Sequence, residues 1–398
     1  MLSGALEGIR VLAFTQGLAG PWAGLLLAAH GAEVVKVESA TAPDAFRRFG
    51  ARNATPRFLE YNLNTLSISV NLKHPRGSEL IKKLVRKFDV VIDNFSAPVL
   101  TKYGLDYADL REIKRNIVML RMPGFGTFGP KRDLQSWGQT LNAFSGALHL
   151  WRQPDAPVPA GSQTPLVDYM GGVIGLCAVM AALLDRDQTG KGHFIDLSQA
   201  ETMGYFTGVT YLQALFNGAD PTPTGNFSPV AAPHDCFPCR GEDRWCVITV
   251  ETEAQWRLLC RAMNRDELTR DPRFSSLASR LKYLAELNSL VAEWTSDREA
   301  EDVMNLLQAS GVPCGMVQTG ADLLHDPHLQ ARRFPVELQH PVAGRLVFPD
   351  VPFRLSQDPG SADRMAPELG EHNSYVFGKI LGLSADEIAQ LEAEQVLS

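Results

Sequence analysis

Segment 159–202, PAGSQTPLVDYMGGVIGLCAVMAALLDRDQTGKGHFIDLSQAET, contains the residue best placed for chemistry, Asp168. Asp168 directly precedes a run of apolar or small residues from Tyr169 to Leu184, which predicts a helix buried on all sides. A carboxylate at a helix N-terminus faces free backbone N–H groups and the positive end of the dipole, so we expect it to stay ionised. Such a carboxylate is either a structural N-cap or a nucleophile.

Cys236 and Cys239 form a C-x-x-C pair, a spacing that also occurs in zinc sites and redox centres. A structural zinc site needs four ligands, and apart from His234 and Asp235 no second pair completes one. Packing is therefore the favoured role of these thiols, and we expect no bound metal. The six cysteines of the chain show no disulfide framework, which is typical of a reducing compartment.

Gly124, Gly126 and Gly129 form G-x-G-x-x-G directly after an apolar strand. Pro130 and the charged KRD follow the motif where a dinucleotide-binding fold has an apolar helix. The pattern therefore predicts a turn with a close backbone approach, and nicotinamide or flavin binding is the weaker alternative.

The elements that position these residues begin with a predicted β-α-β unit at residues 8–38. IRVLAF and EVVKVE read as buried parallel strands, joined by the turn GLAGP and a helix with Pro21 in its first turn. Further apolar strands are SISVNL, DVVIDNF and NIVMLRM, separated by helical segments. An open α/β sheet with helices on both faces is the fold that this alternation predicts.

A proline-rich stretch without periodicity, NGADPTPTGNFSPVAAP, predicts a domain boundary. We expect a large domain from 1–216, a linker at 217–235, a small α/β domain at 236–325, and a return to the large domain at 326–398. In the small domain, Thr252 with Gln255 and Ser296 with Glu299 are predicted helix-capping boxes.

The composition is that of an ordinary globular protein, with 45% hydrophobic residues among 398. The net charge of −7 comes without a basic cluster, which argues against nucleic acid and anionic membranes as partners. The apolar run before Asp185 is shorter than the roughly 20 residues of a bilayer span. The N-terminal residues have no export-signal pattern, so we expect a cytoplasmic location.

The order and spacing of many segments together resemble the family III CoA-transferases over nearly the whole chain. These segments include GIRVLAFTQGLAGP, HGAEVVKVES, VVIDNF, GFGTFGP, TPLVDYMGG, TGKGHFIDLSQAE, SGVPCGMV and APELGEH. The resemblance implies that Asp168 is the nucleophile. In this family the carboxylate attacks an acyl-CoA thioester, and the reaction proceeds through a mixed anhydride and an aspartyl-CoA thioester. Gly171 and Gly172 are expected to leave room for that thioester.

The resemblance also implies CoA contacts, although several positions differ in residue type. The implied contacts are Gln16, Leu18, Ala19, Ser39, Val70, Asn71, Leu72, Lys73, Asn94, Phe95, Lys102 and Gln139. Leu18 stands where the formyl-CoA enzymes have a glutamine, and Gln16 is expected to supply the polar group. Ser39 stands where those enzymes have an arginine. Lys102 also replaces an arginine and keeps the positive charge without the bidentate fork.

Two departures from the family bear on the reaction. The racemase branch has a catalytic histidine where this chain has Trp137, and an indole cannot shuttle protons. The glycine-run flap with which the formyl-CoA enzymes close over a very small substrate has no counterpart here, where the region reads GNFSPVAAPHDCF, so we expect a larger acid. A substituted succinate ranks ahead of a simple fatty or hydroxy acid.

The resemblance therefore predicts an α/β protein with a Rossmann-like large domain built from both chain ends, a small α/β domain, and an interlocked-ring dimer. The predicted function is transfer of CoA from an acyl-CoA donor such as succinyl-CoA to a mid-sized carboxylic acid, with no permanently bound cofactor. Two alternatives stay open: an acyl-CoA racemase or isomerase, and a non-catalytic subunit paired with an active paralogue. The protein is accordingly expected to be a homodimer or a heteromer.

Overall fold

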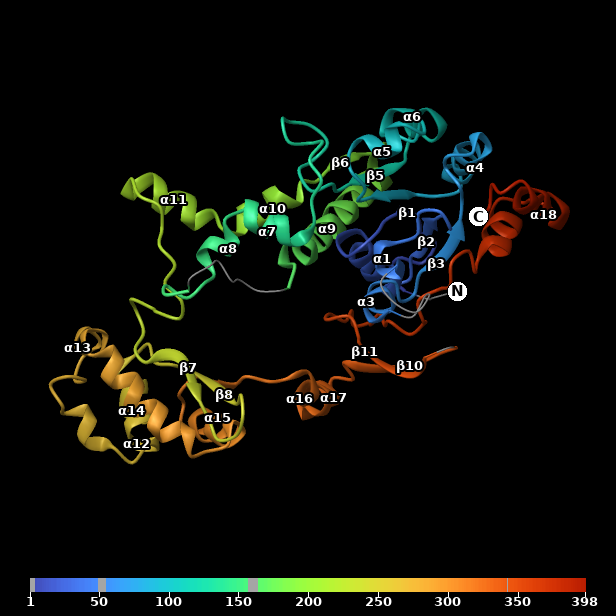
Figure 1. The fold of residues 1–398 in the computed structure, drawn as a ribbon. Coiled ribbons are helices and arrows are strands. Elements are labelled where there is room, and N and C mark those ends of the chain that lie inside the picture. The colour runs from blue at the N-terminus through green and yellow to red at the C-terminus, as the bar shows by residue number, and fades with distance from the viewer. Residues whose placement is uncertain (1–3, 49–54, 157–163, 342) are drawn as a thin grey trace. The chain divides into compact units, whose positions relative to one another are not determined.

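A computed structural model describes residues 4–48, 55–156, 164–341 and 343–398. The chain divides into two compact units, each described here by itself. The large unit comprises Met1–Leu148, Ser162–Asp220 and His328–Ser398, and the small unit comprises His149–Gly161 and Pro221–Pro327 (Figure 1).

The large unit contains a parallel sheet of six strands in the order β3-β2-β1-β4-β5-β6. The strands are β1 (Arg10–Phe14), β2 (Glu33–Glu38), β3 (Leu66–Ser69), β4 (Val90–Asp93), β5 (Val118–Arg121) and β6 (Phe194–Asp196). The chain order reverses between β1 and β4, and ligands of doubly wound sheets bind beyond the carboxyl ends of the strands at this switch point. The predicted α/β fold is confirmed, while β6 was not predicted.

Helices cover both faces of this sheet, which is why side chains on both faces of its strands are buried. The helices up to the one that contains Asp168 are α1 (Ala19–Ala29), α2 (Ala45–Arg48), α3 (Pro56–Tyr61), α4 (Pro75–Val85), α5 (Pro98–Thr101), α6 (Tyr107–Ile113), α7 (Gly138–Phe144), α8 (Ala147–Leu150) and α9 (Leu166–Thr189). On one face, Leu12 and Val91 share a core with α4 and α6, and on the other, Val11 and Ile92 share a core with α1 and α9.

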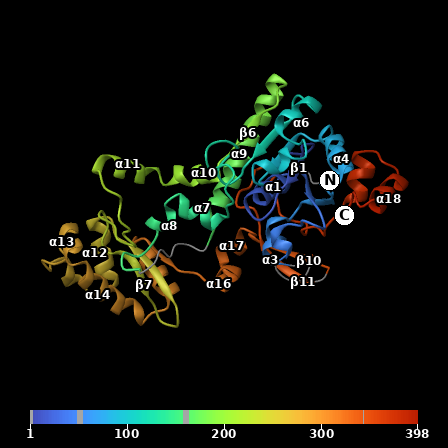
Figure 2. The same cartoon turned by 45° about the horizontal axis from the view of Figure 1, so that its top comes forward.

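The C-terminal part of the chain packs back onto the large unit. Its elements are β10 (Pro335–His340), β11 (Gly344–Pro349), a π-helical segment (Ser374–Ile380) and α18 (Ala385–Ala393). Phe377 and Leu391 belong to the same core cluster as α4, and α18 lies next to α4 in both Figures 1 and 2. Ser384 caps α18 with a hydrogen bond from the Glu387 backbone N–H.

Helix α9 differs from its prediction in length, cap and burial. It has 24 residues, and Pro165 is its N-cap, so Asp168 lies within the first turn. The predicted burial on all sides is wrong for this chain, because Val173 and Leu184 are 41% and 63% exposed. The glycines serve packing: a Cβ on Gly172 would lie 2.9 Å from the Ala19 carbonyl oxygen of α1. The expectation that Gly172 leaves room for a thioester is therefore wrong.

Helix α9 is long and apolar enough to cross a membrane, but core helices of soluble proteins can have the same length and composition. Its Val179, Ala182 and Leu183 pack against the sheet. After β6 the chain forms α10 (Gln199–Phe206) and α11 (Gly208–Asn217). No residue of α11 is buried.

The small unit has an antiparallel sheet in the order β7-β8-β9 packed against helices. Its elements are β7 (His234–Pro238), β8 (Trp245–Thr249), α12 (Glu253–Ala262), a 3-10 turn (Asp266–Thr269), α13 (Leu277–Lys282), α14 (Leu284–Ser296), α15 (Ala300–Ala309), β9 (Cys314–Met316) and α16 (Gly320–His325), followed at the unit boundary by α17 (Pro327–Ala331). The Thr252–Gln255 capping box is confirmed, whereas Ser296 ends α14 and Glu299 caps α15 without a side-chain bond. Cys239 is buried in this core.

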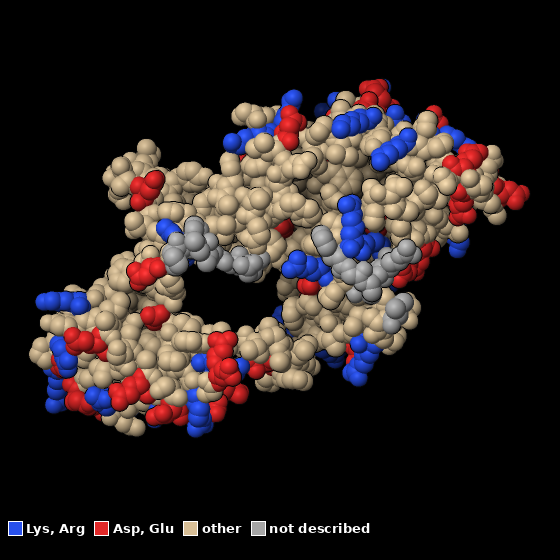
Figure 3. Space-filling model, viewed as in Figure 1, with Lys and Arg blue, Asp and Glu red and all other residues tan. Residues whose placement is uncertain are grey.

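Lysine, arginine, aspartate and glutamate side chains are interspersed over the face shown in Figure 3. No broad field of one sign occupies that face. The surface over α10 and α11 is mostly uncharged there.

Candidate active site

Asp168 lines a cavity of about 560 Å³ at the carboxyl ends of the sheet strands. The walls come from the loops after β1, β4 and β5, the helices α2 and α3, the start of α7 and the first turn of α9. Because β1 and β4 flank the switch point of the sheet, the cavity lies where this fold class binds ligands.

A second cavity of about 250 Å³ shares Gln16 and Ser96 with the first. It is lined by the loop after β1, the ends of β2 and β3 and the segment after β4. The shared lining residues mean that the two cavities adjoin across the loop after β1.

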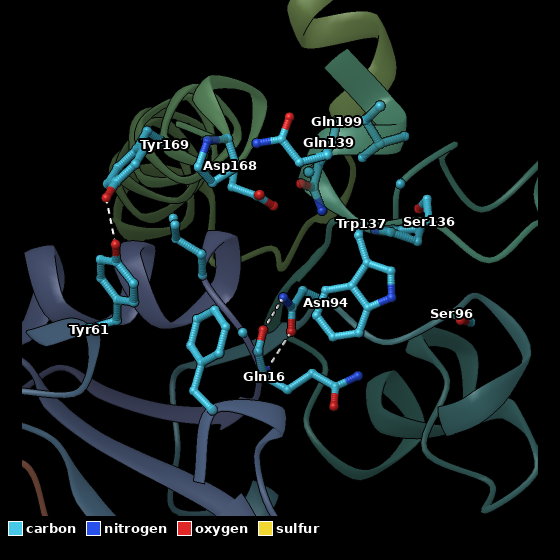
Figure 4. A pocket seen from close by; sticks show the side chains of 18 of the residues that line it. Gln16, Tyr61, Asn94, Ser96, Ser136, Trp137, Gln139, Asp168, Tyr169 and Gln199 are labelled. Atoms are coloured by element: carbon cyan, nitrogen blue, oxygen red, sulfur yellow. Dashed lines mark hydrogen bonds between the residues drawn. The ribbon is translucent and has the colours of Figure 1, made fainter. Parts of the chain in front are cut away.

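Two pairs of polar groups fix the loop between the cavities. The Gln16 backbone N–H donates to Asn94 Oδ1 at 2.9 Å, and Asn94 Nδ2 donates back to the Gln16 carbonyl at 2.8 Å (Figure 4). Buried Lys36 donates to the Thr15 carbonyl and to Asp44, each at 2.8 Å. Burying this ion pair is tolerable because each charge has a partner and further hydrogen bonds. The loop therefore has a defined backbone before any ligand binds.

The Asp168 carboxyl group points into the first cavity (Figure 4) and has no hydrogen-bond or ion-pair partner among the described residues. Burial raises its pKa to about 7, and no neighbouring cation counters this effect. The expectation that the helix N-terminus keeps it fully ionised is therefore wrong near neutral pH. Both the carboxylic acid and the carboxylate are populated near that pH, and a poorly solvated carboxylate is a stronger nucleophile than a hydrated one.

Gly138, at the start of α7, lies against the carboxyl group. A Cβ built on Gly138 would lie 2.0 Å from Asp168 Oδ2 and 2.5 Å from Pro165 Cβ. Only a residue without a side chain allows the carboxyl group its observed position.

Two tyrosines join α3 to the first turn of α9. The hydroxyl groups of Tyr61 and Tyr169 are 2.6 Å apart and hydrogen-bonded (Figure 4). Tyr169 also makes an edge-to-face contact with Trp22 of α1. Burial raises the pKa of both phenols, so they stay neutral. These contacts position the residue that follows Asp168.

Comparison with known proteins identifies the family of this chain. Residues 6–373 match the sequence profile of CoA-transferase family III. The chain belongs to this family. It is 33% identical to the succinyl-CoA–D-citramalate CoA-transferase of Chloroflexus aurantiacus, over 98% of each chain. It is also 33% identical to the beta subunit of the succinyl-CoA–L-malate CoA-transferase of that organism, again over 98% of each.

A solved structure shares the fold. The crystal structure of a CAIB/BAIF family protein from Brucella suis has a TM-score of 0.87 and 29% identity. The match covers 95% of this chain and 100% of that chain. The family resemblance predicted from the sequence motifs is thus confirmed, and the protein is a CoA-transferase by family.

The structure brings most of the predicted CoA-transferase site residues together. The first cavity is lined by Gln16, Leu18, Asn94, Gln139 and Asp168, and the second by Gln16, Ser39, Val70, Asn71, Leu72, Lys73 and Phe95. Ala19 is buried as the first residue of α1. Lys102 is the exposed C-cap of α5 and lines neither cavity.

Other residues of the first cavity were not predicted as site residues. They include Arg57, Tyr61, Ser136, Tyr169 and Gln199. Arg57 and Tyr61 lie far from Asp168 in sequence, and no local motif marks them. Gln199 belongs to the quoted DLSQAE segment, so that motif could have identified it. The G-x-G-x-x-G segment is a close-approach turn as predicted, because a Cβ on Gly124 would meet Ser136 Oγ.

Asp168→Asn is expected to raise the thermal midpoint by more at pH 8 than at pH 4.5. The pKa of Asp168 is about 7 in the folded protein and near 4 in the unfolded chain. Between pH 4 and pH 7 the folded state therefore holds a proton on this carboxyl group that the unfolded state releases. Wild type therefore loses stability as the pH rises through this window, and the neutral amide does not. Because solvent reaches the cavity, we expect Asp168→Asn to raise the free energy of unfolding by roughly 1–3 kcal/mol more at pH 8 than at pH 4.5. Equal shifts at both pH values in thermal unfolding would show an ordinary carboxyl pKa.

Proposed function

We propose that this protein transfers CoA from a CoA thioester such as succinyl-CoA to a dicarboxylic acid of four or five carbons, with Asp168 as nucleophile. The observation that carries the proposal is the unpaired carboxyl group of Asp168 in a cavity that adjoins the predicted CoA-binding residues. The acid class follows from the relatives, which are named for citramalate and malate, both substituted succinates.

The reaction needs only acyl exchange between oxygen and sulfur. The Asp168 carboxylate attacks the thioester carbonyl carbon, the C–S bond breaks, and a mixed anhydride and the CoA thiolate form. The thiolate then attacks the Asp168 carbonyl carbon and releases the donor acid, leaving an aspartyl-CoA thioester. An acceptor carboxylate repeats these steps in reverse and regenerates Asp168. The positive end of the α9 dipole, in whose first turn Asp168 lies, would stabilise the negative charge of the tetrahedral oxyanions.

The residues that line the second cavity suit the different chemical groups of CoA. Leu72 and Phe95 offer apolar contact to the pantetheine arm, and Asn71 offers polar groups to its amides. Arg48 and Lys73 at the same cavity offer positive charge to phosphate groups. The thiol end then reaches Asp168 past Gln16, which lines both cavities.

The residues around Asp168 do not favour the racemase alternative. Inversion at an α-carbon needs an acid and a base on opposite faces, and Trp137 lines the cavity where the racemases have their histidine. Among the described lining residues there is no histidine or lysine. Asp168 is the one carboxyl group among these lining residues, so they offer one base and no second carboxyl, imidazole or amino group to serve the opposite face of an α-carbon.

A turnover experiment in heavy water distinguishes transferase from racemase. We expect CoA to appear on the acceptor acid only when donor and acceptor are both supplied, with no deuterium at the α-carbon of either acid. The reason is that transfer involves the carboxyl carbon only, whereas racemisation must break the α-C–H bond. Mass spectrometry of the CoA products measures both. Rapid α-deuteration of a 2-methylacyl-CoA without a second acid would overturn the transferase proposal.

We also propose that the protein works as an interlocked dimer, with its own copy or with a paralogue. Support comes from the large apolar side chains that α10 and α11 expose, among them Tyr205, Leu215 and Phe216 at 84%, 76% and 80%. Monomeric proteins rarely expose apolar patches of this kind. A relative named as a beta subunit makes a paralogous partner reasonable. The intact Asp168 site argues against a purely non-catalytic subunit.

A further inference from the structure

The wall of the first cavity carries two arginines, Arg57 and Arg132. Arg57 belongs to α3, and no described residue forms an ion pair or hydrogen bond with its guanidinium group. Burial raises the pKa of Glu60, and the charge of Arg57 on the same helix partly opposes that increase. The other arginine at the cavity, Arg132, has Asp133 at 3.5 Å. A guanidinium group without a hydrogen-bond partner can offer its N–H donors to a ligand.

Arg57 is held on the cavity side of α3 by two features. Its guanidinium group lies 5.7 Å from the centre of the Phe46 ring, a cation–π contact, and Phe46 also lines the cavity. Arg57 and Tyr61 are four residues apart on one helix, so their side chains share a face. The hydrogen bond from Tyr61 to Tyr169 fixes that face beside the first turn of α9.

The positive charge of Arg57 acts on Glu60, Tyr61 and Tyr169. Burial raises the pKa of Tyr61 and Tyr169, and the positive charge of Arg57 opposes that increase in both. Burial alone displaces the pKa of Asp168. Asp168 and Arg57 line the same cavity, so one ligand bound there can contact both the carboxyl and the guanidinium group.

We propose that Arg57 is the specificity residue that binds the distal carboxylate of the dicarboxylic acid while the proximal carboxylate reacts at Asp168. This inference rests on the proposed function and names the residue that selects its substrate class. A guanidinium group matches the geometry of a carboxylate and forms charge-assisted hydrogen bonds with it. An acid with a neutral distal group leaves Arg57 without a partner and loses this binding energy.

The test is an internal competition between two acids of equal length. Wild type, Arg57→Gln, Arg57→Lys and Arg132→Gln are each given one CoA donor and an equimolar mixture of glutarate and its monoamide. Both acids compete for the same aspartyl-CoA intermediate, so the product ratio equals the ratio of kcat/KM values and the donor half-reaction cancels. Mass spectrometry of the two CoA products at early times gives the ratio.

We expect wild type and Arg132→Gln to prefer glutarate by roughly 10- to 100-fold, and Arg57→Gln to approach parity while still charging the monoamide. Arg57→Lys should keep part of the preference for glutarate, because lysine keeps the positive charge but cannot form two parallel hydrogen bonds with a carboxylate. Continued transfer to the monoamide shows that the variant is folded. An unchanged ratio in Arg57→Gln, or a loss of preference in Arg132→Gln instead, would overturn the inference. Transfer by wild type to neither acid would count against the proposed function itself.

Discussion

Asp168→Asn is expected to lower CoA transfer roughly 10⁴-fold or more, because an amide cannot form the mixed anhydride. Asp168→Ala should have the same effect. Asparagine has nearly the same shape as aspartate, and Pro165, not Asp168, is the N-cap of α9, so the helix loses no cap. Steady-state rates with any active donor and acceptor pair measure the loss.

Asp187→Asn is the matched control, since Asp187 lies on the same helix with a 69% exposed side chain. It should keep wild-type activity. Transfer by Asp168→Asn within about tenfold of wild type would show that another group is the nucleophile.

Gly138→Ala is expected to lower kcat roughly 100-fold, because the added methyl group and Asp168 Oδ2 cannot occupy the same space. Pro165 blocks the methyl group on a second side, so the carboxyl group or the start of α7 must move. A displaced nucleophile is no longer aligned with the thioester carbonyl carbon. Single-turnover kinetics with saturating acyl-CoA report this step directly.

Gly320→Ala is the control for that variant. Gly320 is exposed at the start of α16, and nothing lies within 4 Å of its added Cβ. It should behave as wild type. A wild-type single-turnover rate in Gly138→Ala would mean that the observed contact does not set the position of Asp168.

The sequence predicted those parts of the fold that depend on local pattern. Strands β1 to β5 contain short apolar stretches that are almost fully buried, and such stretches mark buried parallel strands. Strand β6 was not predicted because it has only three residues, Phe194–Asp196, and is defined by its pairing with β5. The predicted burial of α9 failed because apolar composition does not distinguish a core face from a face that stays exposed in one chain.

The candidate site was predictable where its residues follow one another in a motif. The Val70–Lys73 segment and the Asn94-Phe95 pair were quoted as CoA contacts, and they line one cavity. Arg57 was not predicted, because α3 meets the first turn of α9 only in the folded chain, through a hydrogen bond between Tyr61 and Tyr169, which are 108 residues apart in sequence. The raised pKa of Asp168 was also missed, since burial is a property of the folded cavity.

Trapping of the acylated or CoA-linked carboxyl group tests the central claim most directly. Wild type is incubated with an acyl-CoA donor and hydroxylamine, which attacks activated carboxyl groups, and the protein is then digested and sequenced by mass spectrometry. We predict a hydroxamate on Asp168, dependent on the acyl-CoA and absent from Asp168→Asn. A hydroxamate on any other carboxyl group, or none while CoA transfer proceeds, would contradict the assignment of Asp168 as the nucleophile.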